Sequence, residues 1–138
     1  MQIKKYTTLA LLLTLSISLS SCMDKKTEDP AKAYKLWAGE KAPKEVQVIH
    51  GKYWQSAHWT KEYIVYLELQ TSAVWTKEFI RQNSLMPSME PTDVPPGFPA
   101  WFLPDKHFKR YVPSDLSKES SYFIDTVSWK MFLYEMQL

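Results

Sequence analysis

The residues whose chemistry would support metal binding or redox work are few and widely spaced. The three histidines are His50, His58 and His107, and no two of them lie four residues apart, as two ligands on one helix would. Cys22 is the only cysteine, so no second thiol is available as a ligand. This spacing favours ordinary surface histidines. We therefore expect no metal and no cofactor.

Motifs for nucleophilic catalysis and for phosphate binding are absent from the sequence. The only glycines are Gly39, Gly51 and Gly97. Because they are so few, no serine lies in a Gly-x-Ser-x-Gly turn and no glycine-rich loop can surround a phosphate. The sequence therefore gives no indication of a serine hydrolase or of a nucleotide-binding enzyme.

Pairs of carboxylates can perform acid–base chemistry on sugars. Glu62 and Glu68 flank the strongest predicted strand, and Asp125 lies in a later strand of the same expected sheet. The chain has 15 acidic residues, however, and no motif selects a pair among them. We interpret these three as solvated strand residues. An envelope hydrolase acting on cell-wall or glycan material remains an alternative.

The context of Cys22 suggests a different use for its thiol. The chain begins with Lys4 and Lys5 in a basic start, and an apolar stretch follows from Leu9 to Leu19. A basic start, a short apolar segment and small residues before a cleavage point are typical of a secretory signal peptide. The segment Leu19-Ser20-Ser21-Cys22 resembles the lipobox of bacterial lipoproteins. The resemblance implies that residues 1–21 are removed and that Cys22 becomes the acylated first residue, carrying fatty acids such as palmitate.

The resemblance also implies a place in the cell envelope. The apolar stretch is shorter than the roughly 20 residues that cross a bilayer, so acyl chains would hold the protein to the membrane. In enterobacterial lipoproteins, an aspartate directly after the cysteine retains the protein in the inner membrane. Met23 occupies that position here, which favours the outer membrane. Acidic residues just after the cysteine direct some lipoproteins to the cell surface, so Asp24, Glu28 and Asp29 leave the choice between periplasmic face and surface open.

The expected mature chain is electrically balanced. The full sequence has 17 basic and 15 acidic residues, and residues 1–21 remove Lys4 and Lys5, which leaves 15 of each sign. This balance gives no indication of a nucleic-acid partner. With its only cysteine used for lipid, the mature chain has no disulfide, so its many aromatic side chains must supply the core.

The predicted organisation is a lipidated flexible tether over residues 22–30 and one α+β domain over residues 31–138. We predict a short helix over 31–38 and a main helix over 72–83, where apolar residues form one stripe. The predicted strands form two hairpins, 46–57 with 63–69 and 122–125 with 129–136. The expected fold is a small antiparallel sheet of about four strands with one main helix packed on one face.

Residues 87–104 contain six of the nine prolines, which excludes a regular element there. Phe98, Trp101 and Phe102 are unusual for a disordered linker, so we predict an ordered loop held by its aromatic side chains. In one interpretation these three residues, with Trp59 in a predicted turn, form an exposed patch that binds a protein partner. In the other, which we favour, the loop is a lid over the sheet.

Three functions are compatible with these patterns. The first is a membrane-anchored envelope lipoprotein that acts as a non-catalytic binding or accessory module, including an immunity-type partner of a toxin. The second is the envelope hydrolase, which predicts a deep polar cleft with perturbed titratable groups. The third is a structural or lipid-binding spacer, which predicts an apolar cavity for an acyl chain. The absence of catalytic motifs favours the first.

Overall fold

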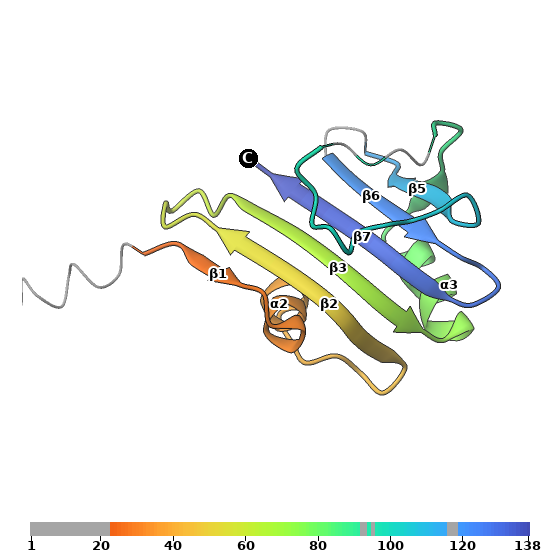
Figure 1. Ribbon diagram of the computed structural model, residues 1–138, viewed down its shortest axis with the longest axis horizontal. Helices are drawn as coiled ribbons and strands as arrows, with labels where there is room; N and C mark the ends of the chain where they lie inside the picture. The colour runs from red at the N-terminus through yellow and green to blue at the C-terminus, as the bar shows by residue number, and fades with distance from the viewer. Residues whose placement is uncertain (1–22, 92–93, 95, 116–118) are drawn as a thin grey trace, which may run out of the picture.

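The computed structural model describes residues 23–91, 94, 96–115 and 119–138 of the chain, so Cys22 lies outside the described residues. It contains one antiparallel sheet in which the strands follow the order β1-β2-β3-β7-β6-β5-β4 (Figure 1). The strands are β1 (Lys25–Thr27), β2 (Val46–Gln55), β3 (Tyr63–Thr71), β4 (Leu85–Pro87), β5 (Lys109–Pro113), β6 (Glu119–Ile124) and β7 (Lys130–Gln137).

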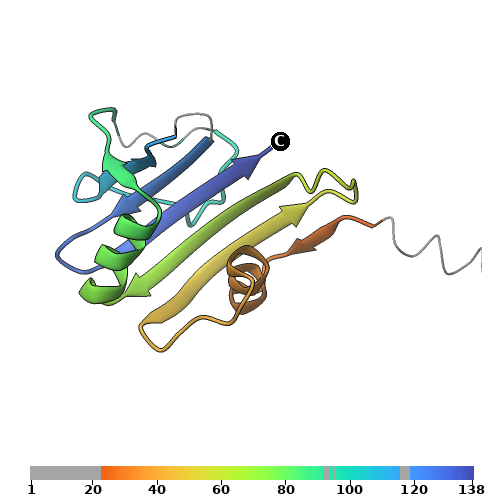
Figure 2. The same cartoon turned by 180° about the vertical axis from the view of Figure 1, so that it is seen from behind.

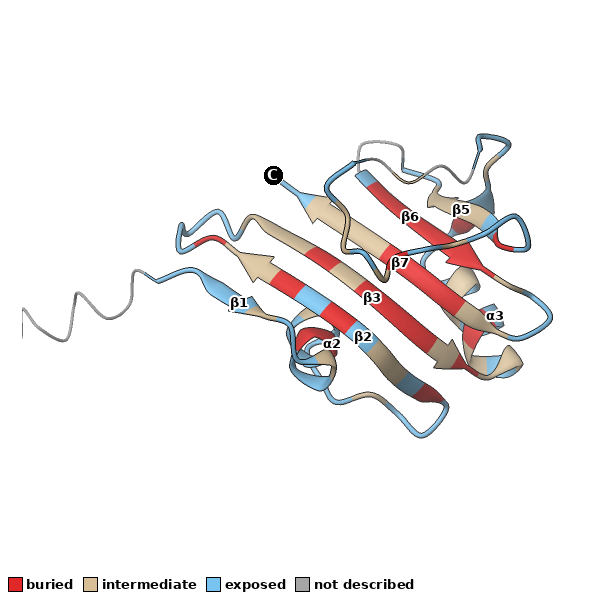
Figure 3. Ribbon diagram, in the orientation of Figure 1, coloured by how far each residue is buried: buried red, intermediate tan, exposed pale blue. Residues whose placement is uncertain are grey.

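The pairing of β3 with β7 joins the two halves of the sheet. Its register runs without a break from Tyr63 opposite Gln137 to Gln70 opposite Lys130. On one side β3 also pairs with β2, and on the other side β7 also pairs with β6. Both central strands are therefore flanked by neighbours on either edge, and Figure 3 shows that buried residues concentrate along them.

Two helices, α2 (Pro30–Ala38) and α3 (Ala73–Gln82), lie on one face of the sheet (Figure 2). A side chain caps the first turn of each helix. Oδ1 of Asp29 accepts a hydrogen bond from the backbone N–H of Lys32 at 2.8 Å, and Oγ of Ser72 accepts one from Trp75 at 3.1 Å. These caps satisfy backbone donors that have no partner within the helix. Both predicted helices are thus present at nearly their predicted bounds.

A β-bulge in β2 decides which side chains face the helices. The register shifts between Val48, opposite Leu69, and His50, opposite Glu68. Val48 before the bulge and Tyr53 after it both pack in the helix-side core, although one position is even and the other odd. The bulge therefore reverses the alternation and turns His50 towards the opposite face.

The helix-side core packs closely around Gly51. A Cβ atom at this position would lie 2.8 Å from Cβ of Ala33 and 3.1 Å from Cα of Pro30, both in α2. The helix can rest on β2 only because Gly51 has no side chain. The fully buried apolar residues beneath the helices are Val65, Leu67, Leu69, Ile124, Met131 and Leu133.

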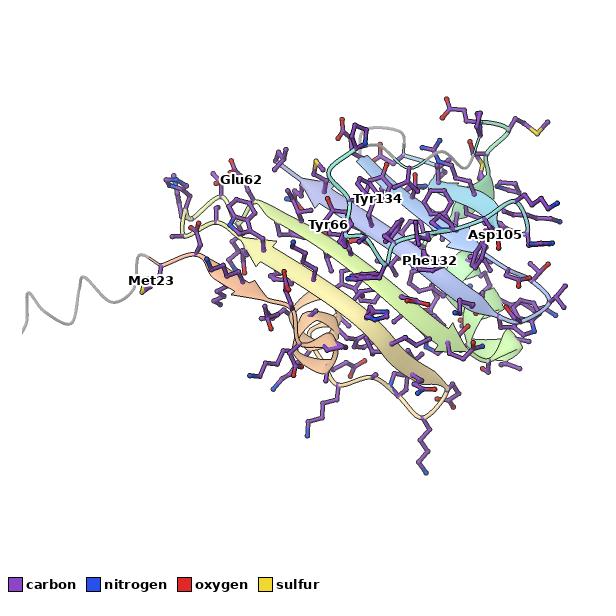
Figure 4. All side chains as sticks on the ribbon, viewed as in Figure 1. Met23, Glu62, Tyr66, Asp105, Phe132 and Tyr134 are labelled. Carbon is purple, nitrogen blue, oxygen red and sulfur yellow. The ribbon has the colours of Figure 1, made fainter. Side chains whose placement is uncertain are left out.

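The loop between β4 and β5 covers the opposite face. Phe102 inserts from this loop between aromatic side chains of the sheet, with its ring centroid 5.3 Å from Phe132 and 6.0 Å from Phe123. Only 1% of Phe102 is exposed, whereas its neighbour Leu103 is 71% exposed. Figure 4 shows the loop passing in front of Phe132. The loop thus completes a second aromatic core.

The predicted fold class is wrong. Within the described residues, the sheet has seven strands instead of about four, and it carries two short helices of similar length instead of one main helix. The two predicted hairpins are present, β2 with β3 and β6 with β7. The three missed strands are β1, β4 and β5. They have three to five residues each, too few for an alternating pattern, and they form because they pair with longer neighbours.

Part of the expected tether is also folded. Lys25–Thr27 pairs with the end of β2, from Lys25 opposite Gln55 to Thr27 opposite Tyr53. Charged residues cannot drive this pairing by burial, but an edge strand needs only backbone hydrogen bonds to its neighbour. The flexible connection expected over residues 22–30 is therefore not seen from Lys25 onwards.

Within the described residues, neither α2 nor α3 is long and apolar enough to cross a membrane.

We predict that Phe102 is a main contributor to stability and that Leu103 is not. Phe102→Ala removes a buried ring and should lower the free energy of unfolding by about 3–5 kcal/mol. Leu103→Ala, one residue further on, should change it by no more than about 0.5 kcal/mol. Urea unfolding followed by circular dichroism would measure both. Equal effects of the two substitutions would show that the loop does not cover the sheet as described.

Candidate functional site

A pocket of about 700 Å³ opens on the helix-bearing face of the sheet. It lies where β3 begins and β7 ends, and neither helix lines it. Figure 2 shows that this end of β7 is left uncovered by α2 and α3. Tyr63, Tyr122 and Glu135 project into the pocket from β3, β6 and β7, and Leu85 and Pro113 form part of its apolar wall.

Glu135 is the centre of this pocket. It lies on β7 between the two neighbouring strands, and tyrosine side chains reach it diagonally from both. The hydroxyl of Tyr63 donates a hydrogen bond to its Oε2 at 2.9 Å, and the hydroxyl of Tyr122 donates one to its Oε1 at 2.5 Å. Each carboxylate oxygen keeps further acceptor capacity towards the pocket.

Both tyrosines remain neutral donors. Burial raises the pKa of Tyr63 and of Tyr122 well above the usual value, and the nearby negative charge of Glu135 raises each pKa further. The hydrogen bonds that the two hydroxyls donate act in the same direction, since they stabilise the protonated phenols. The two hydroxyl groups therefore hold the carboxylate in position and do not act as bases near neutral pH.

The charge of Glu135 has no basic partner among the described residues. Glu68, on the opposite face, provides the contrast. Its side chain is 8% exposed, and its two oxygens lie 2.6 Å from Nδ1 of His50 and 3.0 Å from Nζ of Lys130. The second acidic side chain that lines the pocket is Glu119, and no described Lys, Arg or His lines it. The pocket is therefore anionic.

This arrangement is suited to holding a positive charge. A cation in the pocket would meet an ionised carboxylate whose position is already fixed, together with two phenol rings, and aromatic rings attract cations. The apolar wall would receive the uncharged part of the same ligand. Binding of an organic cation in this pocket would not require a metal ion. Among the described residues, no group of three His, Cys, Asp or Glu side chains is placed to hold one.

Of the four aromatic residues proposed as a partner-binding patch, the structure brings Phe98, Trp101 and Phe102 together, but they pack on the sheet and do not form an exposed patch. Phe102 is buried, and Phe98 lies over the sheet with its ring centroid 4.8 Å from that of Tyr66. Trp101 stacks on His50 with ring centroids 5.0 Å apart. Trp59 lies apart from them at the tip of the β2–β3 hairpin, and it is 93% exposed. Cys22, the predicted lipidation site, lies outside the described residues.

The three carboxylates weighed for acid–base chemistry have separate structural surroundings. Glu68 forms the ion pairs described above, and Glu62 accepts a backbone hydrogen bond at the β2–β3 hairpin through its carbonyl oxygen. Asp125 accepts hydrogen bonds from Val127 and Ser128 in the β6–β7 turn, and these lower its pKa. None of the three lines the pocket.

Sequence analysis did not identify Glu135, Tyr63 and Tyr122 as a group. One signal was available, because Glu135 is the only acidic residue in the apolar segment 129–136. A charge within a central strand usually has a specific partner. The two tyrosines could not be connected with it, since their proximity depends on the pairing of three strands.

No protein-family model, curated protein sequence or solved structure significantly matches this chain.

We predict that alkaline pH destabilises the protein through Tyr63 and Tyr122. In the unfolded chain tyrosines ionise at about pH 10, whereas the folded-state pKa of these two is raised. Their contribution to stability is complete below the unfolded pKa and is lost as the pH rises towards the folded pKa. Urea unfolding between pH 8 and 11 should show falling stability, with a shallower fall in Tyr122→Phe. An identical pH dependence in the variant would contradict this prediction.

Proposed function

We propose that the protein is a lipid-anchored lipoprotein of the cell envelope, with the outer membrane as its favoured location, and that its domain is a non-catalytic binding module. The lipobox-like segment ending at Cys22 supports the anchor. The observation that carries the binding role is the pocket in which Glu135, held by two tyrosine hydroxyls, has no basic partner among the residues that the structure describes. The ligand is a molecule that presents a primary ammonium group.

Electrostatics supports this choice of ligand. A carboxylate that is partly removed from water loses hydration, and a cation restores a favourable environment for it. The hydroxyls of Tyr63 and Tyr122 reduce that cost only in part, because they are neutral. The two tyrosine hydroxyls use two of the roughly four acceptor sites on the Glu135 carboxylate, and an ammonium group can donate hydrogen bonds to the sites that remain. The phenol rings add a cation–π attraction.

The same pocket argues against the two alternative functions. The pocket has the polar lining and the perturbed titratable groups expected of a hydrolase, but the perturbed groups are Tyr63 and Tyr122. Their raised pKa values take both hydroxyls away from the range in which a general acid or base exchanges a proton at the working pH. A spacer that stores an acyl chain needs an apolar cavity. This pocket is lined by Asn83, Glu119 and Gln137 as well as by the central carboxylate, so it suits a charged ligand better.

The anchor makes a prediction for the cell. Cys22→Ser removes the only thiol that can be acylated, so incorporation of labelled palmitate should be lost and the protein should leave the membrane fraction. Ser20→Ala keeps a small residue in the same segment and should retain both properties. Palmitate labelling and membrane fractionation of the two variants would measure the difference. Labelling that persists in Cys22→Ser would refute the lipoprotein assignment.

The pocket makes a prediction for binding. Titration calorimetry should detect binding of 1,5-diaminopentane, and none of the uncharged 1,5-pentanediol, because only the diamine can pair with Glu135. Glu135→Gln removes the charge and keeps the shape, so it should weaken diamine binding about ten- to hundredfold. Glu78→Gln, on the exposed surface of α3, is the matched control and should bind as the wild type does.

Two results would refute cation binding. The first is equal affinity of Glu135→Gln and the wild type. The second is equal binding of the diamine and the diol, since the charge would then contribute nothing.

A further inference from the structure

The first described residues of the chain are attached to the loop end of the β2–β3 hairpin. Oδ1 of Asp24 accepts a hydrogen bond from the backbone N–H of Ala57 at 2.9 Å, and its Oδ2 accepts one from Nε1 of Trp54 at 3.3 Å. β1 follows at once and pairs with the end of β2. The start of the domain and the hairpin loop over residues 56–62 therefore occupy the same end of the sheet (Figure 1).

This attachment limits how far the domain can lie from Cys22. Only Met23 separates Cys22 from Asp24, and two residues span at most about 7 Å of extended chain. A lipid on Cys22 would therefore bring the hairpin loop to the membrane surface. The connection between Cys22 and the folded domain is short, because Lys25–Thr27, which was expected to be part of a flexible tether, pairs with β2 as β1.

The surface at this end carries the side chains that suit a membrane interface. All six tryptophans are described, and Trp59 is the only exposed one. Met23 is 78% exposed at the same end. Tryptophan is enriched at the level of lipid headgroups, where its apolar ring is buried and its N–H reaches water or a headgroup.

Charged residues around the loop are compatible with the same partner. Lys25, Lys26 and Lys61 are exposed there and can attract anionic headgroups. The acidic residues near the loop are Asp24 and Glu62, and Glu119 and Glu135 of the pocket lie at the same end of the sheet, on its helix-bearing face. The carboxylate of Asp24 already accepts the two hydrogen bonds described above, so it is part of the attachment and not a free charge facing outwards.

We propose that the tip of the β2–β3 hairpin docks on the membrane that carries the lipid anchor, with Trp59 inserted at the level of the headgroups. The partner is the bilayer surface itself. This inference rests on the proposed lipid anchor at Cys22. It adds an orientation, since it directs the hairpin end of the sheet towards the lipid and the β6–β7 turn away from it.

Quenching of tryptophan fluorescence by brominated lipids would test the orientation. The full-length acylated protein is placed in vesicles of phosphatidylethanolamine and phosphatidylglycerol with brominated acyl chains. We expect these vesicles to quench the wild type, and Trp59→Phe to lose more than half of the quenching. Trp129→Phe, at the opposite end of the sheet, is the matched control and should keep all of it. Trp59 is exposed, so its replacement should leave the circular dichroism spectrum unchanged.

Flotation of the same vesicles separates failure of the docking from failure of the anchor. If the wild type floats with the vesicles and Trp59→Phe is quenched as strongly as the wild type, the docking is refuted and the anchor stands. If the acylated wild type does not float, the anchor is refuted, and the docking that rests on it falls as well.

Discussion

The hydrogen-bonded pairing of β3 with β7 is the constraint on which the rest of the structure depends. It joins the β1–β2–β3 unit to the β7–β6–β5–β4 unit, and it creates two buried faces at once. Side chains such as Leu67 and Leu133 pack under the helices, while Phe132 packs under the loop between β4 and β5. The same pairing places Glu68 and Glu135 on opposite sides of the sheet, with Glu68 buried and Glu135 in the pocket that the helices leave uncovered.

Sequence patterns predicted the elements that are long enough to show a period. The stripe on α3 and the alternation in β3 are local properties, and both were found at nearly the predicted bounds. The size of the sheet was not predictable in this way. Lys25–Thr27 and Leu85–Pro87 carry no strand pattern of their own, and their structure comes from the neighbour that each pairs with. The bulge before His50 also hid the alternation of β2.

The candidate site was less accessible to sequence reasoning than the fold. The pocket depends on Tyr63, Tyr122 and Glu135, which belong to three strands and share no sequence spacing. The three side chains lie close together only because β7 lies between β3 and β6 in the sheet. Sequence patterns predict strands but not their order in a sheet. The contrast between Glu68 and Glu135 is equally non-local. One has basic partners from β2 and β7, and the other has only neutral phenols, although both appear in sequence as single acids within apolar strands.

The central place of β7 has a consequence for how the chain folds. β7 follows all the other strands in sequence, yet it lies between β3 and β6. Until residues 130–137 are available, β3 and β6 each have an unpaired edge, and neither core can close. Such long-range pairing is slow to form. The chain therefore cannot reach its stable form before residues 130–137 have joined the sheet. The same delay leaves truncated chains with exposed strand edges, which are sites of aggregation.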